Sequence, residues 1–306
     1  MDTPDVPAGS IVVGIDGSPW SDDALDWAIE QAALEQRTLT IVHAIMAMGT
    51  QAVGLYGSSG LDYGRLLNDA RADAQALLSA AAAHAHERDP HLRVHDVLSV
   101  SDPRTVLLAL GEHAAMVVVG SRGRGPVASL LLGSVSVSVS KHAPCPVVVR
   151  RGREAVRSEQ RIVVGVDGTE VSLPAIEFAY RIASFRGCAL SVLHCYSIAP
   201  PVAPARGGEL LPDLEADRAL VSESLAGMAE KFPDVEVTVQ LVSGFADQQL
   251  LAPAPDVDLV VIGRRRTSLL ADLVHDSVAP AVLEHALVAV AVVPAPALGP
   301  QLPTAV

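Results

Sequence analysis

Residues 11–18 read Ile-Val-Val-Gly-Ile-Asp-Gly-Ser, and residues 162–169 read Ile-Val-Val-Gly-Val-Asp-Gly-Thr. Each stretch is an apolar segment that ends on an aspartate and a glycine, so Asp16 matches Asp167 at an offset of 151 residues (167 − 16). A short apolar run bounded by turn residues is typical of a buried β-strand. The chain is therefore predicted to contain two copies of one domain.

The length and composition of the chain agree with such a duplication. Its 306 residues suit two domains of about 150 residues each, and the repeat places them at residues 9–150 and 160–294. Half of the residues are apolar and only 3% are aromatic, which favours an aliphatic core and buried parallel strands. The net charge of −13 disfavours general binding to nucleic acid or to an anionic membrane surface, but a small anion held by backbone groups is compatible with it.

Targeting and metal signals are weak in this sequence. No apolar run approaches the roughly 18 residues of a membrane span, and the acidic start lacks the pattern of a signal peptide, so a cytoplasmic protein is expected. The cysteines are too few and too irregularly spaced for a disulfide framework or a zinc site. Buried apolar thiols are expected at Cys145, Cys188 and Cys195.

Strand-like and helix-like segments alternate in both halves. Strands are expected in the first half at Ile11–Ile15, Thr38–Ile45, Leu92–Val100, Met116–Val119 and Val147–Arg150. Helices are expected after Ser18 and over Leu66–His86, Pro103–His113 and Gly133–His142. Strands are expected in the second half at Arg161–Val166, Leu190–Cys195, Val235–Val242, Leu259–Ile262 and Val288–Val293. This alternation predicts an α/β fold in each domain, with a five-stranded parallel sheet of order 3-2-1-4-5 flanked by helices.

Basic residues gather around the joint between the halves. Because glutamates are interspersed among them, a solvated linker is favoured over a surface for an acidic partner. The arginines concerned are Arg150, Arg151, Arg153, Arg157 and Arg161.

A glycine-rich segment follows the fourth expected strand of the first half. Residues 120–123 read Gly-Ser-Arg-Gly, and residues 133–134 read Gly-Ser after a spacer of nine. The glycines permit a tight turn and close approach of backbone amides to a ligand. The N–H groups and positive dipole end of the helix that opens at Gly133 suit a phosphate, to which the hydroxyls of Ser134 and Ser136 can add hydrogen bonds. At the carboxyl ends of strands one and four, where the strand order reverses, a nucleotide is expected to bind.

Simpler explanations exist for these residues. The glycines also fit a flexible turn, and Asp16 also fits a cap for its own turn rather than a contact to ribose or adenine. Neither a P-loop Gly-Lys-Ser/Thr nor a Gly-x-Gly-x-x-Gly after the first strand is present. The four-residue loop of KH-type RNA modules is disfavoured by the acidic balance and by the order of elements.

Together these motifs resemble the universal stress protein family. The resemblance rests on the Val-Gly-Ile-Asp-Gly-Ser first strand, on Gly-x-x-Gly with a nine-residue spacer before Gly-Ser, and on the Cys-Pro-Val-Val-Val last strand at residues 145–149. It covers both halves and implies a tandem member of the ATP-binding branch, with two Rossmann-like domains of the adenine nucleotide alpha hydrolase-like type. Members of the family often pair through the fifth strand, so the resemblance also implies internal pairing of the halves, a homodimer and an unknown regulatory protein partner.

The resemblance assigns roles to particular residues. Asp16 would contact the adenosine part of ATP, and the backbone of Ala44 would meet adenine. Mg²⁺ can bridge the phosphates, although no acidic cage for it is visible. The implied binding residues are Gly14, Asp16, Gly17, Ser18, Ala44, Gly120, Ser121, Arg122, Gly123, Arg124, Gly133, Ser134, Val135 and Ser136.

The second half departs from this motif. Gly263 is kept, but Arg266 and Asp276 replace the later glycines and Ser277 follows. Arg266 would block close backbone approach, although its guanidinium could instead attract a phosphate. Asp276 would cap the helix and repel a phosphate by roughly 1 to 4 kcal/mol, which weakens binding about tenfold to several hundredfold. A weaker or lost second site is expected at Asp167, Cys195, Gly263, Arg266 and Ser277.

Two functions fit a nucleotide site of this kind. The first is a regulatory or sensor protein of the stress response, in which ATP occupancy alters contact with a partner. The alternative is a slow ATP hydrolase using the same site, but no acidic or histidine residue near the motif has a clear catalytic role. His142 is expected to bond the last carbonyls of its helix. The matched His43 and His194 are expected to pack or hydrogen-bond rather than to hold a metal.

Overall fold

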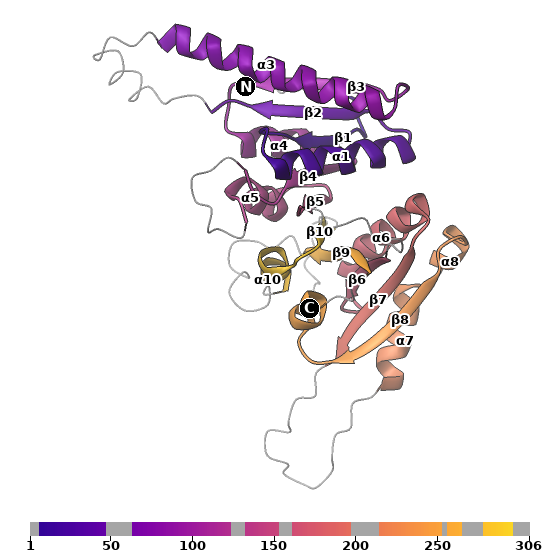
Figure 1. Ribbon diagram of the computed structural model, residues 1–306. Helices are drawn as coiled ribbons and strands as arrows, with labels where there is room; N and C mark the ends of the chain where they lie inside the picture. Colours follow the sequence, from indigo (N-terminus) through magenta and orange to yellow (C-terminus); the bar gives the residue numbers. More distant parts are fainter. Residues whose placement is uncertain are drawn as a thin grey trace, which may run out of the picture. The chain divides into compact units, whose positions relative to one another are not determined.

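The computed structural model describes residues 6–46, 63–123, 132–152, 161–196, 214–252, 256–264 and 278–295. The chain divides into two compact units, Met1–Val156 and Arg157–Val306, which are called here the first and second units. Both are built from parallel strands and flanking helices (Figure 1). The predicted α/β class is confirmed.

In the first unit the strands follow the order β3-β2-β1-β4-β5, and all of them are parallel. This is the predicted order 3-2-1-4-5. It places the carboxyl ends of β1 and β4 side by side, where the direction of winding changes and a crevice forms. The elements are β1 (Ile11–Gly14), α1 (Pro19–Leu34), β2 (Leu39–Ala44), α3 (Tyr63–Arg88), β3 (Val94–Ser99), α4 (Pro103–Gly111), β4 (Met116–Gly120), α5 (Ser134–His142) and β5 (Val147–Arg150).

The second unit repeats the arrangement with the order β8-β7-β6-β9-β10. The short elements η1 and α8 were not predicted from the sequence. The elements are β6 (Arg161–Val166), η1 (Glu170–Ser172), α6 (Leu173–Arg186), β7 (Ala189–Tyr196), α7 (Leu214–Ser224), α8 (Met228–Lys231), β8 (Val237–Ser243), α9 (Ala246–Leu251), β9 (Val257–Arg264), α10 (Val278–His285) and β10 (Ala289–Pro294).

The core of each unit is aliphatic, as the composition predicted. Val12 and Val118 in the first unit and Val164 and Val261 in the second have no exposed surface. Burial of such side chains supplies most of the stabilising free energy, at roughly 25 cal/mol per Å² of apolar surface.

A glycine of the first strand lets a helix lie close to the sheet in both units. A Cβ atom on Gly14 would lie 3.2 Å from the Leu107 side chain of α4, and one on Gly165 would lie 3.0 Å from the Leu250 side chain of α9. Gly14, which the resemblance assigned to ligand binding, therefore also has a packing role.

The prediction of a solvated joint is wrong for Arg150. Its guanidinium forms a bidentate pair with Asp23 of α1, with Nε–Oδ2 and Nη2–Oδ1 distances of 3.1 and 3.3 Å, and both side chains are largely buried. Arg161 opens β6 and pairs with Asp256 at 2.8 Å. These contacts could not be predicted from the sequence because each partner is far away along the chain.

The prediction of buried thiols holds for Cys145, whereas Cys188 and Cys195 are only half-buried. No helix among the described residues is long and apolar enough to cross a membrane.

Candidate functional site

The turn after β1 holds Asp16 in a fixed position. Its Oδ1 accepts a hydrogen bond from the backbone N–H of Ser18 at 3.0 Å, and Gly17 takes a φ of 73°, a conformation that favours glycine. Ser18 is the N-cap of α1, where its side chain accepts from the Ser21 N–H. The carboxylate does cap its own turn, as the simpler explanation held, but it uses only one oxygen for this bond.

The other oxygen of Asp16 faces the glycine-rich segment. A Cβ atom on Gly123 would lie 2.4 Å from Asp16 Oδ2, a distance at which the carboxylate would have to move. The structure thus brings together the aspartate after the first strand and the glycine segment after the fourth strand.

Gly120 is required for a different reason. A Cβ atom there would lie 2.6 Å from the backbone oxygen of Trp20 in α1. The end of β4 therefore passes directly over the first turn of α1, and this close contact sets the path of the segment that follows. The N–H of Ser121 donates to the Arg150 carbonyl at 2.7 Å, and the Ser121 carbonyl accepts from the Gly133 N–H, also at 2.7 Å.

The start of α5 carries no side-chain cap. Gly133 is the N-cap residue, with φ −75° and ψ 151°, and it makes no side-chain hydrogen bond to the first turn. Ser134 is exposed and Val135 half-buried. The positive end of the helix dipole and its first N–H groups are available to an anion in such an arrangement.

Ser136 has a structural role that differs from the predicted contact with a phosphate. Ser136 is 3% exposed, and its hydroxyl donates to the Gly120 carbonyl at 2.7 Å. The donor is thereby committed to holding α5 against the end of β4.

Two guanidinium groups add positive charge next to this segment. Arg122 lies over the ring of Trp20, 5.5 Å from its centroid, and Arg151 directly follows β5. Burial lowers the pKa of Arg151, and the charge of Arg122 lowers it further. The sequence assigned Arg151 to the solvated joint, and its burial shows that this prediction is wrong for Arg151 as well. The pairing of Gly120 with Arg150 places it one residue beyond the strand end next to the motif.

The matched histidines anchor the second strand of each unit. Nδ1 of His43 donates to the Ile15 carbonyl at 2.7 Å, and Nδ1 of His194 donates to the Val166 carbonyl at 3.0 Å. The predicted hydrogen-bonding role is confirmed. Ala44 is the last residue of β2, beside the end of β1.

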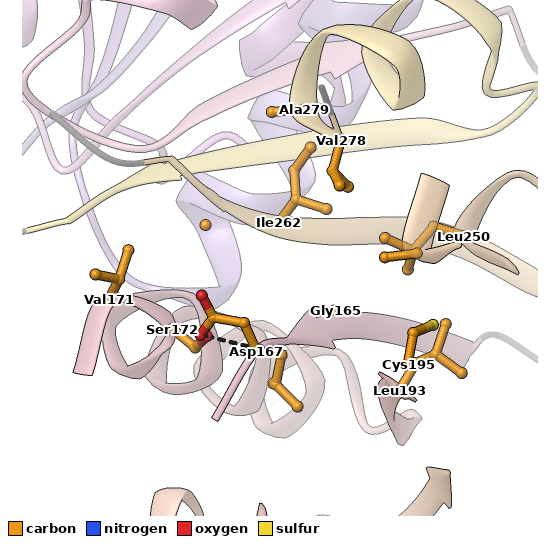
Figure 2. A pocket seen from close by; sticks show the side chains of 13 residues that line it. Gly165, Asp167, Val171, Ser172, Leu193, Cys195, Leu250, Ile262, Val278 and Ala279 are labelled. Carbon is orange, nitrogen blue, oxygen red and sulfur yellow. Dashed lines mark hydrogen bonds between the residues drawn. The ribbon is translucent and has the colours of Figure 1, made fainter. Parts of the chain in front are cut away.

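The second unit contains a cavity of about 280 Å³ at the carboxyl ends of β6, β7 and β9 (Figure 2). Three predicted residues of the second site line it: Asp167, Cys195 and Gly263. Arg266, Asp276 and Ser277 lie outside the described residues, as does Arg124 of the first unit.

The carboxylate of Asp167 accepts hydrogen bonds from its own turn. Its Oδ1 accepts from the Thr169 N–H at 2.9 Å, from the Thr169 hydroxyl at 2.7 Å and from the Ser172 hydroxyl. Ser172 in turn accepts from the Asp167 N–H at 3.0 Å. The carboxylate is therefore fixed by its own turn.

Comparison with known proteins agrees with the repeat and the fold. The model of the universal stress protein family matches residues 8–151 and again residues 159–294. The chain belongs to the universal stress protein family. Universal stress protein Rv2005c of Mycobacterium tuberculosis is 34% identical over 286 residues, which cover 92% of this chain and 96% of that protein. Universal stress protein Rv2623 of the same organism is 31% identical over 284 residues, covering 90% and 93%.

A solved structure supports the fold of both universal stress protein units. The crystal structure of a universal stress protein from Archaeoglobus fulgidus superimposes with a TM-score of 0.70 and 19% identity, covering 94% of this chain and 99% of that one. At this identity the likeness concerns the fold alone.

Proposed function

We propose that the first unit binds an adenine nucleotide, ATP, in the crevice at the carboxyl ends of β1 and β4, and that occupancy regulates contact with a protein partner in a stress response. The observation that carries the proposal is the contact between Gly123 and Asp16, where a Cβ atom would meet Oδ2 at 2.4 Å. It joins a carboxylate suited to ribose or adenine donors with a glycine segment suited to phosphates.

The charges around the segment support an anionic ligand. The chain carries a net charge of −13, yet at this place burial lowers the pKa of Arg151 and the charge of Arg122 lowers it further. A bound phosphate would offset both the repulsion between the guanidinium groups and the cost of burying one of them. The N-terminus of α5, with Gly133 as its cap, offers backbone donors to the same anion.

Regulatory binding is favoured over turnover by the surroundings of the motif. Oδ1 of Asp16 accepts from its own turn, and Nδ1 of His142 donates to the Ser138 carbonyl at 2.9 Å, as predicted for a histidine at a helix end. Within the part of the chain that the structure describes, no group of three or more His, Cys, Asp or Glu side chains could hold a metal ion. Mg²⁺ therefore enters the proposal only as an ion carried by the phosphates.

The test is ATP binding by nucleotide-stripped full-length protein and by two alanine variants. Gly123→Ala places a Cβ atom against Asp16, whereas Gly152→Ala is the matched control because nothing lies within 4 Å of a Cβ atom there. We expect Gly123→Ala to lower ATP affinity by about tenfold or more, the effect of roughly 1.4 kcal/mol, and Gly152→Ala to leave it unchanged. Wild-type affinity in Gly123→Ala, or no binding by the wild-type chain, would contradict the proposal.

The regulatory part of the proposal has its own measurement. Light scattering and hydrogen exchange with and without ATP would report assembly and conformation. The proposal includes a homodimer of the wild-type chain. We expect ATP to change the assembly or the conformation of this chain, and to change neither in Gly123→Ala.

A further inference from the structure

The strand β8 forms one edge of the sheet in the second unit. It stands last in the strand order, and among the described residues it pairs only with β7 (Figure 1). The Glu236 carbonyl accepts from the Leu190 N–H, and the Gly244 N–H donates to the Tyr196 carbonyl. Because bonded residues alternate along a strand of a parallel pair, the even-numbered residues bond to β7. The N–H and C=O groups that point away from the sheet belong to Val237, Val239, Leu241 and Ser243.

The sequence of β8 leaves this edge without the usual protection. It reads Val-Thr-Val-Gln-Leu-Val-Ser and contains neither a charged residue nor a proline, two devices that block pairing at exposed sheet edges. The edge strand of the first unit, β3, carries His95 and Asp96. Within the described part of the second unit, the edge at β8 is therefore open to a further strand.

Apolar side chains are exposed on this strand and just after it. Val239 is 46% exposed, and Phe245, two residues beyond the strand end, is 72% exposed. A strand added along β8 would place its alternate side chains against that of Val239 and would cover it. Phe245 would lie at one end of the added strand.

Carboxylates flank the uncharged strand. Asp234 and Glu236 are exposed directly before it, and α7, which packs against β8, carries two further exposed glutamates. Residues 214–252 include seven acidic residues and only two basic ones, Arg218 and Lys231. Each of these two is paired with a glutamate. Such a frame attracts a basic partner, whereas a second copy of this chain would bring the same acidic residues to the contact.

We propose that β8 binds an extended segment of a partner protein as an added strand, and that this segment has alternating apolar residues flanked by lysine or arginine. The outward backbone groups of residues 237–243 supply the hydrogen bonds, and the carboxylates select the basic flanks. The regulatory meaning of this docking rests on the proposed function, but the binding itself does not require ATP.

The test is binding of fluorescein-labelled peptides to the full chain, measured by anisotropy without ATP. The peptides share the core Val-Thr-Val-Thr-Val and carry two lysines, two serines or two glutamates at each end. We expect the lysine peptide to bind about tenfold or more tightly than the glutamate peptide, with the serine peptide between them. The advantage of the lysine peptide should shrink at an ionic strength of about 1 M, where the Debye length is about 3 Å.

Two substitutions at Val239 separate the backbone contact from the side-chain contact. Val239→Pro removes an outward N–H and leaves the bonds to β7 in place, and edge strands accept proline at such positions. Thr238 is already extended, as the residue before a proline must be. We expect Val239→Pro to weaken binding of the lysine peptide about tenfold or more. The matched control, Val239→Thr, keeps the N–H and should change it by less than about threefold.

A charge reversal tests the acidic frame. Glu236→Lys should weaken binding of the lysine peptide by about threefold and strengthen that of the glutamate peptide, the scale of one exposed ion pair. An unchanged circular dichroism spectrum shows that each variant is folded.

Hydrogen exchange followed residue by residue with NMR reads the contact in the wild-type chain and needs no variant. The lysine peptide should slow exchange of the outward N–H groups of Val239 and Leu241. Exchange at Thr238 and Gln240, whose N–H groups face β7, should change little.

The proposal is overturned by the absence of binding of every peptide at millimolar concentration, by equal binding of the lysine and glutamate peptides, or by wild-type affinity in Val239→Pro. A homodimer that light scattering shows to be lost in Val239→Pro, without peptide binding, would assign the edge to a second copy and also overturn it. Failure of the proposed ATP site is read separately, from ATP binding by the Gly123→Ala chain.

Discussion

The turn that follows the first strand begins with Asp-Gly and has a serine five residues after the aspartate in both units, but its hydrogen bonds differ. Asp16 and Asp167 each accept from the N–H two residues later. Ser21, which matches Ser172 at the repeat offset, donates its hydroxyl proton to the Ser18 carbonyl at 2.8 Å. Ser172 instead donates to the carboxylate of Asp167. The aspartate of the second unit is thus tied to its own turn, while that of the first also faces the glycine segment.

The contrast extends to the strand that ends at the motif. A Cβ atom on Gly120 would lie 2.6 Å from the Trp20 backbone oxygen, whereas one on Gly263 would lie 3.4 Å from that of Val171. The units also share features that fix the fold, such as the histidine bond of the second strand. The comparison shows that the hydrogen bond that fixes the second strand is kept in both units, while the contacts at the carboxyl ends of the first and fourth strands differ.

The largest expected effect comes from giving the first unit the acidic residue of the second. Gly133→Asp places a carboxylate at the N-cap of α5, where space for a Cβ atom exists, since its nearest neighbour would lie 3.5 Å away. Repulsion of roughly 1 to 4 kcal/mol should weaken ATP binding about tenfold to several hundredfold. Gly133→Asn is the matched control, because it also caps the helix but is neutral. Equal loss in both variants, measured by calorimetry, would show that charge is not the cause.

Alanine in place of the glycine near the end of the fourth strand should change the stability of the two units by different amounts, and this effect should be smaller than that of Gly133→Asp. Gly120→Ala forces a methyl group against the backbone of α1 and should cost about 1–3 kcal/mol. Gly263→Ala meets only ordinary contacts, so its effect should stay within about 0.5 kcal/mol. Hydrogen exchange of α1 and α6 in the two variants measures the opening free energy of each unit separately. A larger loss of protection in α6 than in α1 would reverse this part of the comparison.

The aspartates that follow the first strand of each unit should differ in how much they contribute to the affinity for ATP. Asp16→Asn keeps an acceptor for the Ser18 N–H but loses the charge. A charge-assisted hydrogen bond to the ligand then becomes a neutral one. This change should weaken ATP binding by about 1 kcal/mol, or roughly fivefold in affinity. Asp167→Asn should not alter the affinity of the tight site. Competition with a labelled ATP analogue measures both, and a similar loss in both variants would mean that the second unit contributes to tight binding.

The smallest expected effect concerns helix caps at matching positions. Asp102 caps α4 and accepts from the Arg104 N–H at 2.8 Å, whereas the N-cap of α9 is Phe245, which makes no side-chain bond and is 72% exposed. Phe245→Asp should stabilise α9 by about 1 kcal/mol, and Asp102→Ala should destabilise α4 by a similar amount. Hydrogen exchange of the two helices measures both changes, and unaltered protection of α9 in Phe245→Asp would show that the missing cap does not limit its stability.

The cap of α4 should also depend on pH. The side-chain hydrogen bond from Arg104 lowers the pKa of Asp102 from 3.8 to about 2. Because the folded value lies below the unfolded one, the contribution of this carboxylate to stability is present above pH 3.8 and is lost as pH falls towards 2.

Much of the fold could be predicted from the sequence because its signals are local. The central strands β1, β4 and β5 of the first unit are short aliphatic runs, and the repeat of Asp16 as Asp167 supplied the division into halves. The carboxyl ends of parallel strands meet at one edge of a sheet, so the approach of Gly123 to Asp16 also followed from the predicted strand order.

The remaining features depend on contacts between distant segments. The bond from Ser136 to the Gly120 carbonyl depends on how α5 lies against β4. Arg150 was assigned to a solvated joint because its partner Asp23 is 127 residues away. The cavity of the second unit depends on how far α9 and α10 stand from the sheet, a distance that no residue pattern specifies.

The central claim is that the two units differ as nucleotide sites, and the most direct measurement is the stoichiometry of ATP binding to the nucleotide-stripped full chain by titration calorimetry. The account predicts one tight site per chain, lost in Gly133→Asp and retained in Asp167→Asn. Two equally tight sites per chain would contradict it.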